Sequence, residues 1–423
     1  MPSRRILPGL VAFSVWLATA SAYANWGHWR GEGGNGLSTQ ATPPTEWSDT
    51  QNVKWKVAIP GRGSSSPVIW GDKVFVTTAM ADNGATDTNT QSRQPLRYVL
   101  MCIDRETGKT LWEKTATTGR PHEGTHHTNS FASASPCTDG EHVYAHFGSQ
   151  GLFCYTMDGQ KVWQRDFGDM RTRNGFGEGS SPTIAGDKIL VPWDHEGPSY
   201  LFALDKLSGD FRWRAERDEP TCWATPLVIE HEGVKQVVMN GQNCARAYDL
   251  ETGKELWRCG GQTQRPAASA VAADGRVFIA SGHRGSFLGA FTPGGTGDIE
   301  GTDSVLWTVS RDTPDIASPL LSDGRLYYYK GKTGVLTCVD AATGRPHYTT
   351  QRTGLRSIYA SPVAAGGYVF LTDRDGTTVV IKDADEYQVV AENSVGETVD
   401  ATPAPVDNQL FIRGEQHLFC IEE

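Results

Sequence analysis

Imidazole and carboxylate side chains gather in two segments of this 423-residue chain. His126 and His127 are adjacent, and Asp194, His195 and Glu196 form a second run. Imidazole nitrogens and carboxylate oxygens bind divalent transition metals in proteins. Because successive side chains of an extended segment point to opposite sides, at most one histidine of an adjacent pair can face a site. His126, His127 and His195 are therefore candidate metal ligands, with ordinary hydrogen-bonding loop histidines as the alternative.

Two carboxylates raise a second chemical hypothesis. Glu178 lies just before the start of one repeat, and Asp194 lies within that repeat. The two could act as a general acid and base on a sugar or an ester. The alternative is that such carboxylates pair with Arg246, Arg284 or Arg311 and order the loops. The sequence contains no Gly-x-Ser-x-Gly elbow and no phosphate-binding Gly-rich loop, so it indicates neither of those enzyme classes and assigns no catalytic residue.

A repeated unit organises the chain around these residues. Each copy starts with Ser or Ala, one further residue and Pro. An apolar run, a Gly-Asp or Asp-Gly turn and a run of β-branched residues follow in that order. Each copy then ends with the motif Asp-x-x-Thr-Gly-Lys-x-x-Trp or a variant of it. The interval from Pro226 to Pro319 spans two copies, and the second of these opens at Ala268-Ser269-Ala270, which gives eight copies. The prolines that start the other seven are Pro67, Pro136, Pro182, Pro226, Pro319, Pro362 and Pro403.

Each copy divides into four segments of strand length. In the sixth copy, residues 319–321, 325–329 and 335–339 are apolar, and Asp323-Gly324 and Thr343-Gly344 supply the φ > 0 residues that tight hairpins need. Four short strands that recur at intervals of roughly 40–50 residues are typical of a propeller blade. The sequence therefore predicts an all-β fold: an eight-bladed β-propeller of four-stranded antiparallel blades that forms one domain over residues 25–423.

Tryptophans recur at one position in the fourth strand of the repeat. Blade-to-blade docking explains several aromatic residues at one position more simply than a ligand stack does. The eighth copy stops after its third strand, and the segment at about residues 52–58 carries a tryptophan of its own, so we expect this segment to supply the missing strand and close the ring. The docking tryptophans are Trp55, Trp112, Trp163, Trp213, Trp257 and Trp307.

Residues 1–24 have the features of a secretory signal peptide. Arg4 and Arg5 precede an apolar stretch, and Ala22-Tyr23-Ala24 offers small residues for cleavage near Ala24. No cysteine for lipidation lies near that point, and no later segment has the roughly 20 apolar residues of a transmembrane helix. Without the peptide the chain carries 37 basic and 49 acidic residues, which argues against nucleic acid as a partner. We expect a soluble monomer that is periplasmic or secreted.

The eight cysteines fit the core better than a disulfide framework. Cys102, Cys154 and Cys338 occupy one repeat position, where other copies carry alanine, and this pattern is typical of small buried residues. Cys222 and Cys244 lie in neighbouring loops of one blade. For this pair alone the sequence leaves a disulfide open.

The repeat resembles the tryptophan-docking repeat of pyrroloquinoline-quinone-dependent alcohol dehydrogenases. Residues 104–112 and 249–257 carry the element in full, and residues 340–344 carry its first half. The same repeat serves the BamB-type outer-membrane assembly factors, so the resemblance implies the fold and either role. A dehydrogenase would imply quinone with Ca²⁺, but the adjacent cysteine pair of those enzymes is missing here and their calcium-binding Glu, Asn and Asp have no counterpart that we can place. The chain is most similar to exported propellers called PQQ-binding-like.

The two faces of such a propeller differ in this chain. Turns within the outer and inner hairpins lie on one face and are short, whereas the loops between strands two and three and between blades lie on the other and are rich in charge. Polar loops around a channel are where binding sites concentrate. We therefore expect a binding protein that captures a small polar or carbohydrate ligand, or an envelope protein, on this loop-rich face. A quinoprotein dehydrogenase, a carbohydrate-active enzyme and a BamB-type scaffold are the alternatives. The candidate residues are His126, His127, Asn129, Glu178, Asp194, His195, Glu196, Arg217, Asp218, Glu219, Trp223, Arg246, Arg284, Arg311, Asp312, Tyr359, Arg374, Asp375, Asp400 and Arg413.

Overall fold

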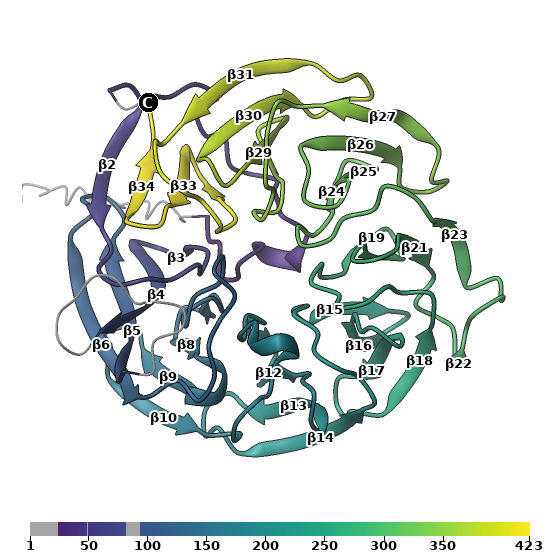
Figure 1. The fold of residues 1–423 in the computed structure, drawn as a ribbon, viewed down its shortest axis with the longest axis horizontal. Coiled ribbons are helices and arrows are strands. Elements are labelled where there is room, and N and C mark those ends of the chain that lie inside the picture. The colour runs from purple at the N-terminus through teal and green to yellow at the C-terminus, as the bar shows by residue number, and fades with distance from the viewer. Residues whose placement is uncertain (1–23, 49, 82–93) are drawn as a thin grey trace, which may run out of the picture.

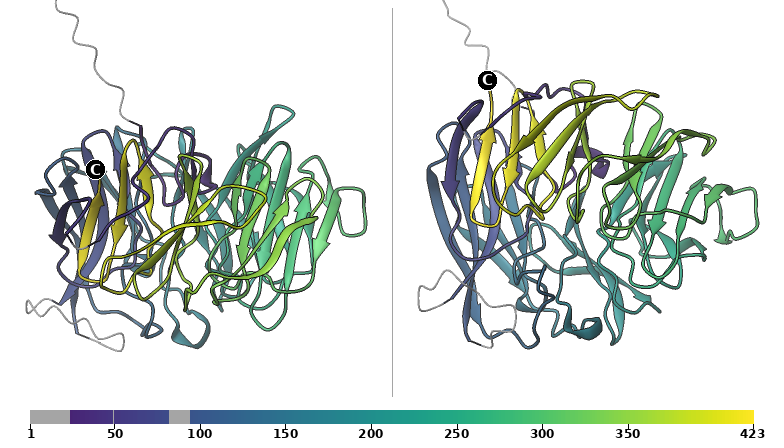
Figure 2. Two further views of the ribbon diagram at one scale, coloured as in Figure 1. Left: turned by 90° about the horizontal axis from the view of Figure 1, so that it is seen from above. Right: turned by 45° about the horizontal axis from the view of Figure 1, so that its top comes forward.

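Eight small β-sheets stand in a ring around a central channel (Figure 1). The computed structural model describes residues 24–48, 50–81 and 94–423. Seen from its side, the ring is a thick disc (Figure 2). The helices of this part of the chain are three short 3₁₀ turns, η1 (Glu32–Gly34), η2 (Gly148–Gln150) and η3 (Arg173–Gly175). The predicted eight-bladed, all-β propeller is confirmed.

The first four blades follow the repeats from inner to outer strand. Neighbouring strands run antiparallel, and tight turns join the first strand to the second and the third strand to the fourth. Blade 1 is β3 (Val68–Trp70), β4 (Lys73–Ala81), β5 (Leu96–Asp104) and β6 (Thr110–Gly119); blade 2 is β7 (Cys137–Thr138), β8 (His142–His146), β9 (Leu152–Thr156) and β10 (Lys161–Arg165). Blade 3 is β11 (Thr183–Ala185), β12 (Lys188–Trp193), β13 (Ser199–Asp205) and β14 (Phe211–Arg217); blade 4 is β15 (Leu227–His231), β16 (Val234–Met239), β17 (Ala245–Asp249) and β18 (Glu255–Cys259).

The second half of the ring repeats this order. Blade 5 is β19 (Val271–Ala273), β20 (Arg276–Ser281), β21 (Phe287–Phe291) and β23 (Val305–Val309); blade 6 is β24 (Leu320–Ser322), β25 (Arg325–Tyr329), β26 (Val335–Asp340) and β27 (Pro346–Arg352). Blade 7 is β28 (Val363–Ala365), β29 (Tyr368–Thr372), β30 (Thr377–Lys382) and β31 (Val389–Ser394); blade 8 contains β32 (Ala404–Val406), β33 (Gln409–Arg413) and β34 (His417–Ile421).

An N-terminal strand completes blade 8, as predicted. β2 (Val53–Ala58) pairs antiparallel with β34, with Val53 opposite Ile421 and Ala58 opposite His417. The two ends of the chain therefore share one sheet, which satisfies the outer edge of β34 and closes the ring.

Two blades carry an additional parallel strand that the repeat does not predict. β22 (Gly297–Asp298) pairs with the outer strand of blade 4, and β1 (Leu37–Ser38) pairs with the inner strand of blade 7. β22 comes from a connection in blade 5 that is longer than a Thr-Gly turn and folds back onto blade 4. β1 belongs to the N-terminal segment described below.

The outer-strand tryptophans contact the next blade. The ring of Trp307 lies against Gly344, where a β-carbon would come within 2.7 Å of the indole, and its Nε1 donates to the Ala341 carbonyl at 3.2 Å. Gly344 has a φ of 70°, so the turn and the indole both favour glycine at this position. Trp55, Trp112, Trp163 and Trp213 have the same relationship to the next blade. Trp257 instead donates to Gln236 of its own blade at 3.0 Å.

A closed belt of hydroxyl groups surrounds the channel. In each blade the residue two positions before the inner strand donates its backbone N–H to the hydroxyl of the equivalent residue in the next blade, at 2.9–3.1 Å. Within the described residues no protein acceptor is recorded for any of these hydroxyl protons, so each remains available as a donor. The belt consists of Ser66, Ser135, Ser181, Thr225, Ser269, Ser318, Ser361 and Thr402.

The N-terminal segment, residues 24–42, lies across the channel at the face of the short turns. η1 lies near the centre of the ring in Figure 1. The segment hydrogen-bonds to seven blades, and Gly34 packs against the eighth at Leu227. We call this segment the plug. Its partners, one in each blade, are Ile69, Thr138, Thr183, Leu227, Ala272, Pro319, Ala364 and Asp407.

Arg30 anchors the plug. Its guanidinium is fully buried and donates to the carbonyls of Gly34, Asn35, Ser318 and Pro319 at 2.6–3.4 Å. Burial lowers the pKa of Arg30 to about 9, so the side chain stays charged at neutral pH. Four carbonyl oxygens take the place of a carboxylate partner.

Some predicted features lie outside the described residues. These are the signal peptide up to residue 23 and most of the insertion between residues 80 and 96. No helix of the described residues is long and apolar enough to cross a membrane.

Candidate functional site

The channel contains a cavity of about 360 Å³ between the plug and the loop-rich face. Trp29 of the plug forms its floor, and seven of the eight belt residues form its wall. Nearer the mouth, Phe176 and Trp223 add aromatic surface. Because the plug contacts every blade, this cavity has its mouth on the loop-rich face. We call it the central cavity.

A chain of polar contacts lines one side of the mouth. A guanidinium N–H of Arg265 donates to Nε2 of His283, and Nδ1 of His283 lies 3.9 Å from the Asp315 carboxylate. Burial and the charge of Arg265 lower the pKa of His283, which keeps the imidazole neutral and able to accept that bond. Lys332 adds a cation whose Nζ lies 5.6 Å from the ring centre of Tyr359.

Tyr359, the neighbour of Lys332, organises further contacts at the mouth. Its hydroxyl accepts a hydrogen bond from Thr128 at 3.1 Å, and the Arg374 guanidinium lies 5.1 Å from its ring centre. Arg374 also pairs with Asp400 through bonds of 2.5 and 3.3 Å. The mouth therefore combines aromatic faces with charges of both signs.

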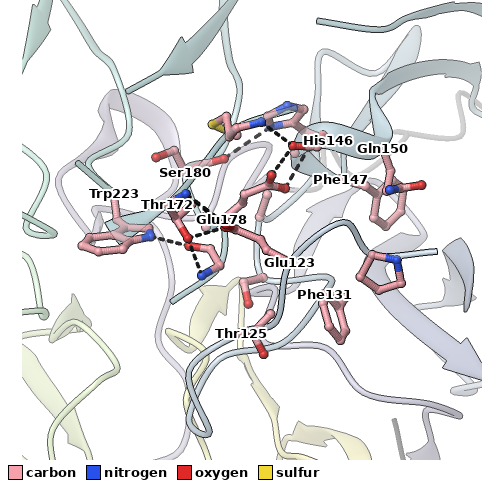
Figure 3. A pocket seen from close by; sticks show the side chains of 18 of the residues that line it. Glu123, Thr125, Phe131, His146, Phe147, Gln150, Thr172, Glu178, Ser180 and Trp223 are labelled. Atoms are coloured by element: carbon pink, nitrogen blue, oxygen red, sulfur yellow. Dashed lines mark hydrogen bonds between the residues drawn. The ribbon is translucent and has the colours of Figure 1, made fainter. Parts of the chain in front are cut away.

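A second, smaller pocket adjoins the central cavity (Figure 3). It encloses about 40 Å³ and shares Ser133, Gly179 and Trp223 with the central cavity. Its walls come mainly from the three loops that join blades 1 to 2, 2 to 3 and 3 to 4, and from η2. We call it the side pocket.

Glu178 is the central polar group of the side pocket. Ser149 donates both its backbone N–H, at 2.9 Å, and its hydroxyl to the two carboxyl oxygens. These bonds favour the ionised carboxylate, yet burial outweighs them and raises the pKa of Glu178 to about 7. Glu123 lies in the same pocket and accepts hydrogen bonds from the backbone N–H and hydroxyl of Thr172.

Asp194 lines the side pocket but is bound to Arg217. The guanidinium binds both carboxylate oxygens, at 2.7 and 2.9 Å, and both side chains are buried. Burial lowers the pKa of Arg217, but the charge of Asp194 outweighs it and holds the pKa well above its usual range. Burial raises the pKa of Asp194, and its bonds to Arg217 oppose that rise. Asp194 is therefore the structural partner of Arg217, whereas Glu178 has no arginine or lysine partner.

The predicted site residues are divided among several environments. The central cavity gathers His126, Asn129, Trp223, Tyr359 and Asp400, and the side pocket gathers Glu178, Asp194 and Trp223. Arg246 pairs with Asp218 and Glu219, and Asp312 pairs with Lys330. Arg284 and Arg311 are exposed, whereas Arg413 is buried and donates to Ser65 and Thr77. The predicted residues that line neither cavity are His127, His195, Glu196, Arg217, Asp218, Glu219, Arg246, Arg284, Arg311, Asp312, Arg374, Asp375 and Arg413.

The three histidines proposed as metal ligands do not converge. The rings of His126 and His127 lie 4.2 Å apart, and burial together with His127 lowers the pKa of His126. Both ring nitrogens of His195 are engaged, by the Arg171 N–H and the Pro198 carbonyl. No group of three or more His, Cys, Asp or Glu within the described residues could hold a metal ion.

Several residues of the two cavities were missed by sequence reasoning. Trp29 precedes the first repeat, so the repeat pattern could not predict its position. Arg265 and Lys332 sit in loops without a recurring pattern. The belt had a visible signal, because Ser or Thr precedes every starting proline, but only the closed ring reveals its hydrogen bonds.

The cavity residues do not fit a calcium-quinone centre. Ca²⁺ takes six to eight oxygen ligands, usually with several carboxylates. The carboxylates that line the central cavity are Asp315 and Asp400, and Arg374 already binds Asp400. The eight cysteines are unpaired, Cys222 and Cys244 included.

Solved structures with this fold have different roles. BamB from Moraxella catarrhalis matches with a TM-score of 0.59 and 13% identity, over 88% of this chain and 97% of that one. A europium-containing methanol dehydrogenase matches with 0.63 and 11%, over 93% and 90%, and the quinohemoprotein alcohol dehydrogenase from Comamonas testosteroni with 0.64 and 12%, over 95% and 81%. At these identities the likeness shows the fold alone.

Sequence comparison identifies the family. No curated protein sequence matches the chain. The profile described as outer membrane protein assembly factor BamB matches residues 15–175, 155–296 and 295–387. The chain therefore belongs to this family of PQQ-like propellers.

Proposed function

We propose that this protein is an exported binding protein of the bacterial cell envelope that captures a small carbohydrate in its central cavity. The observation that supports this proposal is the central cavity, which has a volume of about 360 Å³. Trp29 forms its floor, and belt hydroxyl groups that can donate hydrogen bonds line its wall. Its volume falls in the roughly 300–1,000 Å³ range of small-molecule sites. The predicted signal peptide and the BamB family support the envelope location.

The lining suits a sugar for two physical reasons. Indole and phenol rings such as Trp29, Trp223 and Tyr359 offer flat apolar faces for the C–H side of a sugar ring. The belt hydroxyls, Arg265 and Lys332 offer donors for sugar oxygens. Since the plug contacts all eight blades, these groups are held in place before a ligand arrives, which lowers the ordering cost of binding.

Isothermal titration with glucose, N-acetylglucosamine and glucuronate tests the proposal. At least one sugar should bind, and Trp29→Ala should weaken it tenfold or more. Lys332→Met tests the mouth, with Lys382→Met at the exposed end of β30 as the matched control. Absence of binding for all three sugars, or binding indifferent to Trp29→Ala, would reject the proposed site.

An assembly scaffold of the BamB type is the second candidate function. Leu111, Val162 and Phe211 lie on the outermost strands of blades 1, 2 and 3 and are 46%, 43% and 54% exposed. Apolar side chains along neighbouring outer strands offer a surface for a protein partner. A photo-crosslinker at Phe211 that captures one envelope protein, with Val389 of blade 7 as the control position, would favour this role over sugar capture.

A further inference from the structure

The side pocket is acidic, and its lining contains histidine but no arginine or lysine. Glu123 and Glu178 have no arginine or lysine within ion-pair distance in the described residues, and neither residue type lines the pocket. The third carboxylate, Asp194, is already bound by Arg217. A protein seldom encloses a carboxylate without a cation, because the charged form loses its solvation. A cation bound in the side pocket would therefore stabilise the ionised form of Glu178.

His146 adds an unused acceptor to the same pocket. Its side chain is 1% exposed, and its Nδ1 lies 3.5 Å from the Ser180 carbonyl, which assigns the proton to Nδ1. Nε2 then presents a lone pair, and this atom is buried without a hydrogen-bond partner in the described residues. Burial lowers the pKa of His146 to about 4, so the imidazole is neutral at physiological pH. Nε2 of His146 is therefore available to accept a hydrogen bond from a bound donor.

Aromatic side chains complete the wall. Tyr98, Phe131, Phe147 and Trp223 line the pocket beside the acidic groups. The negative face of an aromatic ring attracts a cation, most strongly where water is excluded. The pocket thus combines carboxylates, a lone-pair acceptor and aromatic surface, all of which favour a cation that carries N–H donors.

Size and donor number narrow the class of cation. A cavity needs roughly 10–15 Å³ to hold one water molecule, so about 40 Å³ has room for two or three non-hydrogen atoms. A guanidinium or a quaternary ammonium group is larger than that. A transition metal would need at least three protein ligands, and the described residues provide no such group.

We propose that the side pocket binds the primary ammonium group of a ligand. Three N–H donors on one compact cation can serve Glu178, the Nε2 of His146 and a further acceptor. Because the pocket adjoins the central cavity at Trp223, a ligand held in the central cavity can extend its amine into the side pocket. The inference rests on the proposed function for the body of the ligand, but the pocket itself can be tested separately.

Methylammonium is the probe, because it fits the side pocket without using the central cavity. Saturation-transfer NMR on the full exported chain should show binding, and titration should give a dissociation constant that Glu178→Gln weakens tenfold or more. His146→Leu should weaken it as well. Glu386→Gln, at an exposed carboxylate of blade 7, and Trp29→Ala, on the floor of the central cavity, should leave it unchanged.

Two measurements on the unaltered protein keep the proposal testable if a variant does not fold. Tetramethylammonium, which has the charge but no N–H, should not bind, and methanol should not compete. Glucosamine with glucose as its control identifies an amino sugar as the source of the amine, and glycine with acetate identifies an amino acid. The proposal is overturned if methylammonium does not bind, or if tetramethylammonium binds equally well. It is also overturned if neither glucosamine nor glycine competes with methylammonium. Each of these results is independent of whether a sugar binds in the central cavity.

Discussion

The backbone N–H of Thr402 donates a 2.9 Å hydrogen bond to the hydroxyl of Ser66, and this bond joins the last blade to the first at the channel wall. β2 joins the same two ends of the chain at the rim, where it pairs with β34. The ring is therefore closed twice, once by side chains around the central cavity and once by a strand at the outside.

Loss of one belt hydroxyl should destabilise the ring. The Thr402 hydroxyl accepts the buried Ser361 N–H at 3.1 Å, so Thr402→Val leaves that donor unsatisfied. We expect a loss of about 1–3 kcal/mol in the free energy of unfolding, measured by urea denaturation. Thr402→Ser keeps the hydroxyl and is the control. Equal stability of the valine and serine variants would show that the belt bond contributes nothing measurable.

Two glycines of blade 6 separate packing from backbone strain. Gly344 and Gly324 have φ values of 70° and 74°, but a β-carbon at Gly344 would meet Trp307 at 2.7 Å, whereas nothing lies within 4 Å at Gly324. Gly324→Ala should cost about 1 kcal/mol of unfolding free energy. Gly344→Ala should cost roughly 1–3 kcal/mol more, because the indole must move. Thermal melts of both variants measure the difference, and equal melting temperatures would contradict the docking role of Trp307.

Asp194 should behave as a structural residue. Asp194→Ala leaves the Arg217 charge buried and should cost about 3–5 kcal/mol. Asp194→Leu combined with Arg217→Met should recover most of this loss, because it removes both charges. Urea denaturation of the single and double variants measures the recovery. A single variant as stable as the parent would restore Asp194 as a candidate acid or base.

Stability should fall as Glu178 loses its proton. The pKa of Glu178 is raised to about 7 in the folded protein, against an ordinary value of 4.5. The folded state thus holds a proton between these values that the unfolded state has released, so this stabilisation is complete below pH 4.5 and is lost as the pH rises through 7. Among its neighbours, His122 lowers the pKa of Glu178 and Glu123 raises it.

The size of this effect is on the order of 1–3 kcal/mol, because part of Glu178 stays open to the side pocket. Unfolding free energies at pH 5 and pH 8, compared between the parent protein and Glu178→Gln, isolate it from other titrating groups. The glutamine variant should show the weaker pH dependence. Identical pH dependence in both proteins would show that burial does not shift this carboxyl group.

The ring could be predicted because its strands and turns repeat along the sequence. Much of the site could not, because its residues lie in segments that do not repeat. Glycine turns and outer-strand tryptophans recur at fixed positions, so the sequence predicted eight blades and the closing role of Val53–Ala58. Trp29 and Arg30 come from a segment that occurs once, and no periodicity shows that it crosses the channel. The Asp194–Arg217 pair joins the ends of two strands whose side chains could equally have faced the cavity. The repeat register assigned the charged residues to loops, but which of them pair with one another depends on three-dimensional packing.

A crystal structure of the exported chain soaked with glucose and N-acetylglucosamine tests the central claim most directly. We expect a sugar in the central cavity, with its ring against Trp29 and its oxygens within hydrogen-bond distance of belt residues such as Ser361 and Thr402. Sugar density only on the outer surface, with water alone above Trp29, would contradict it.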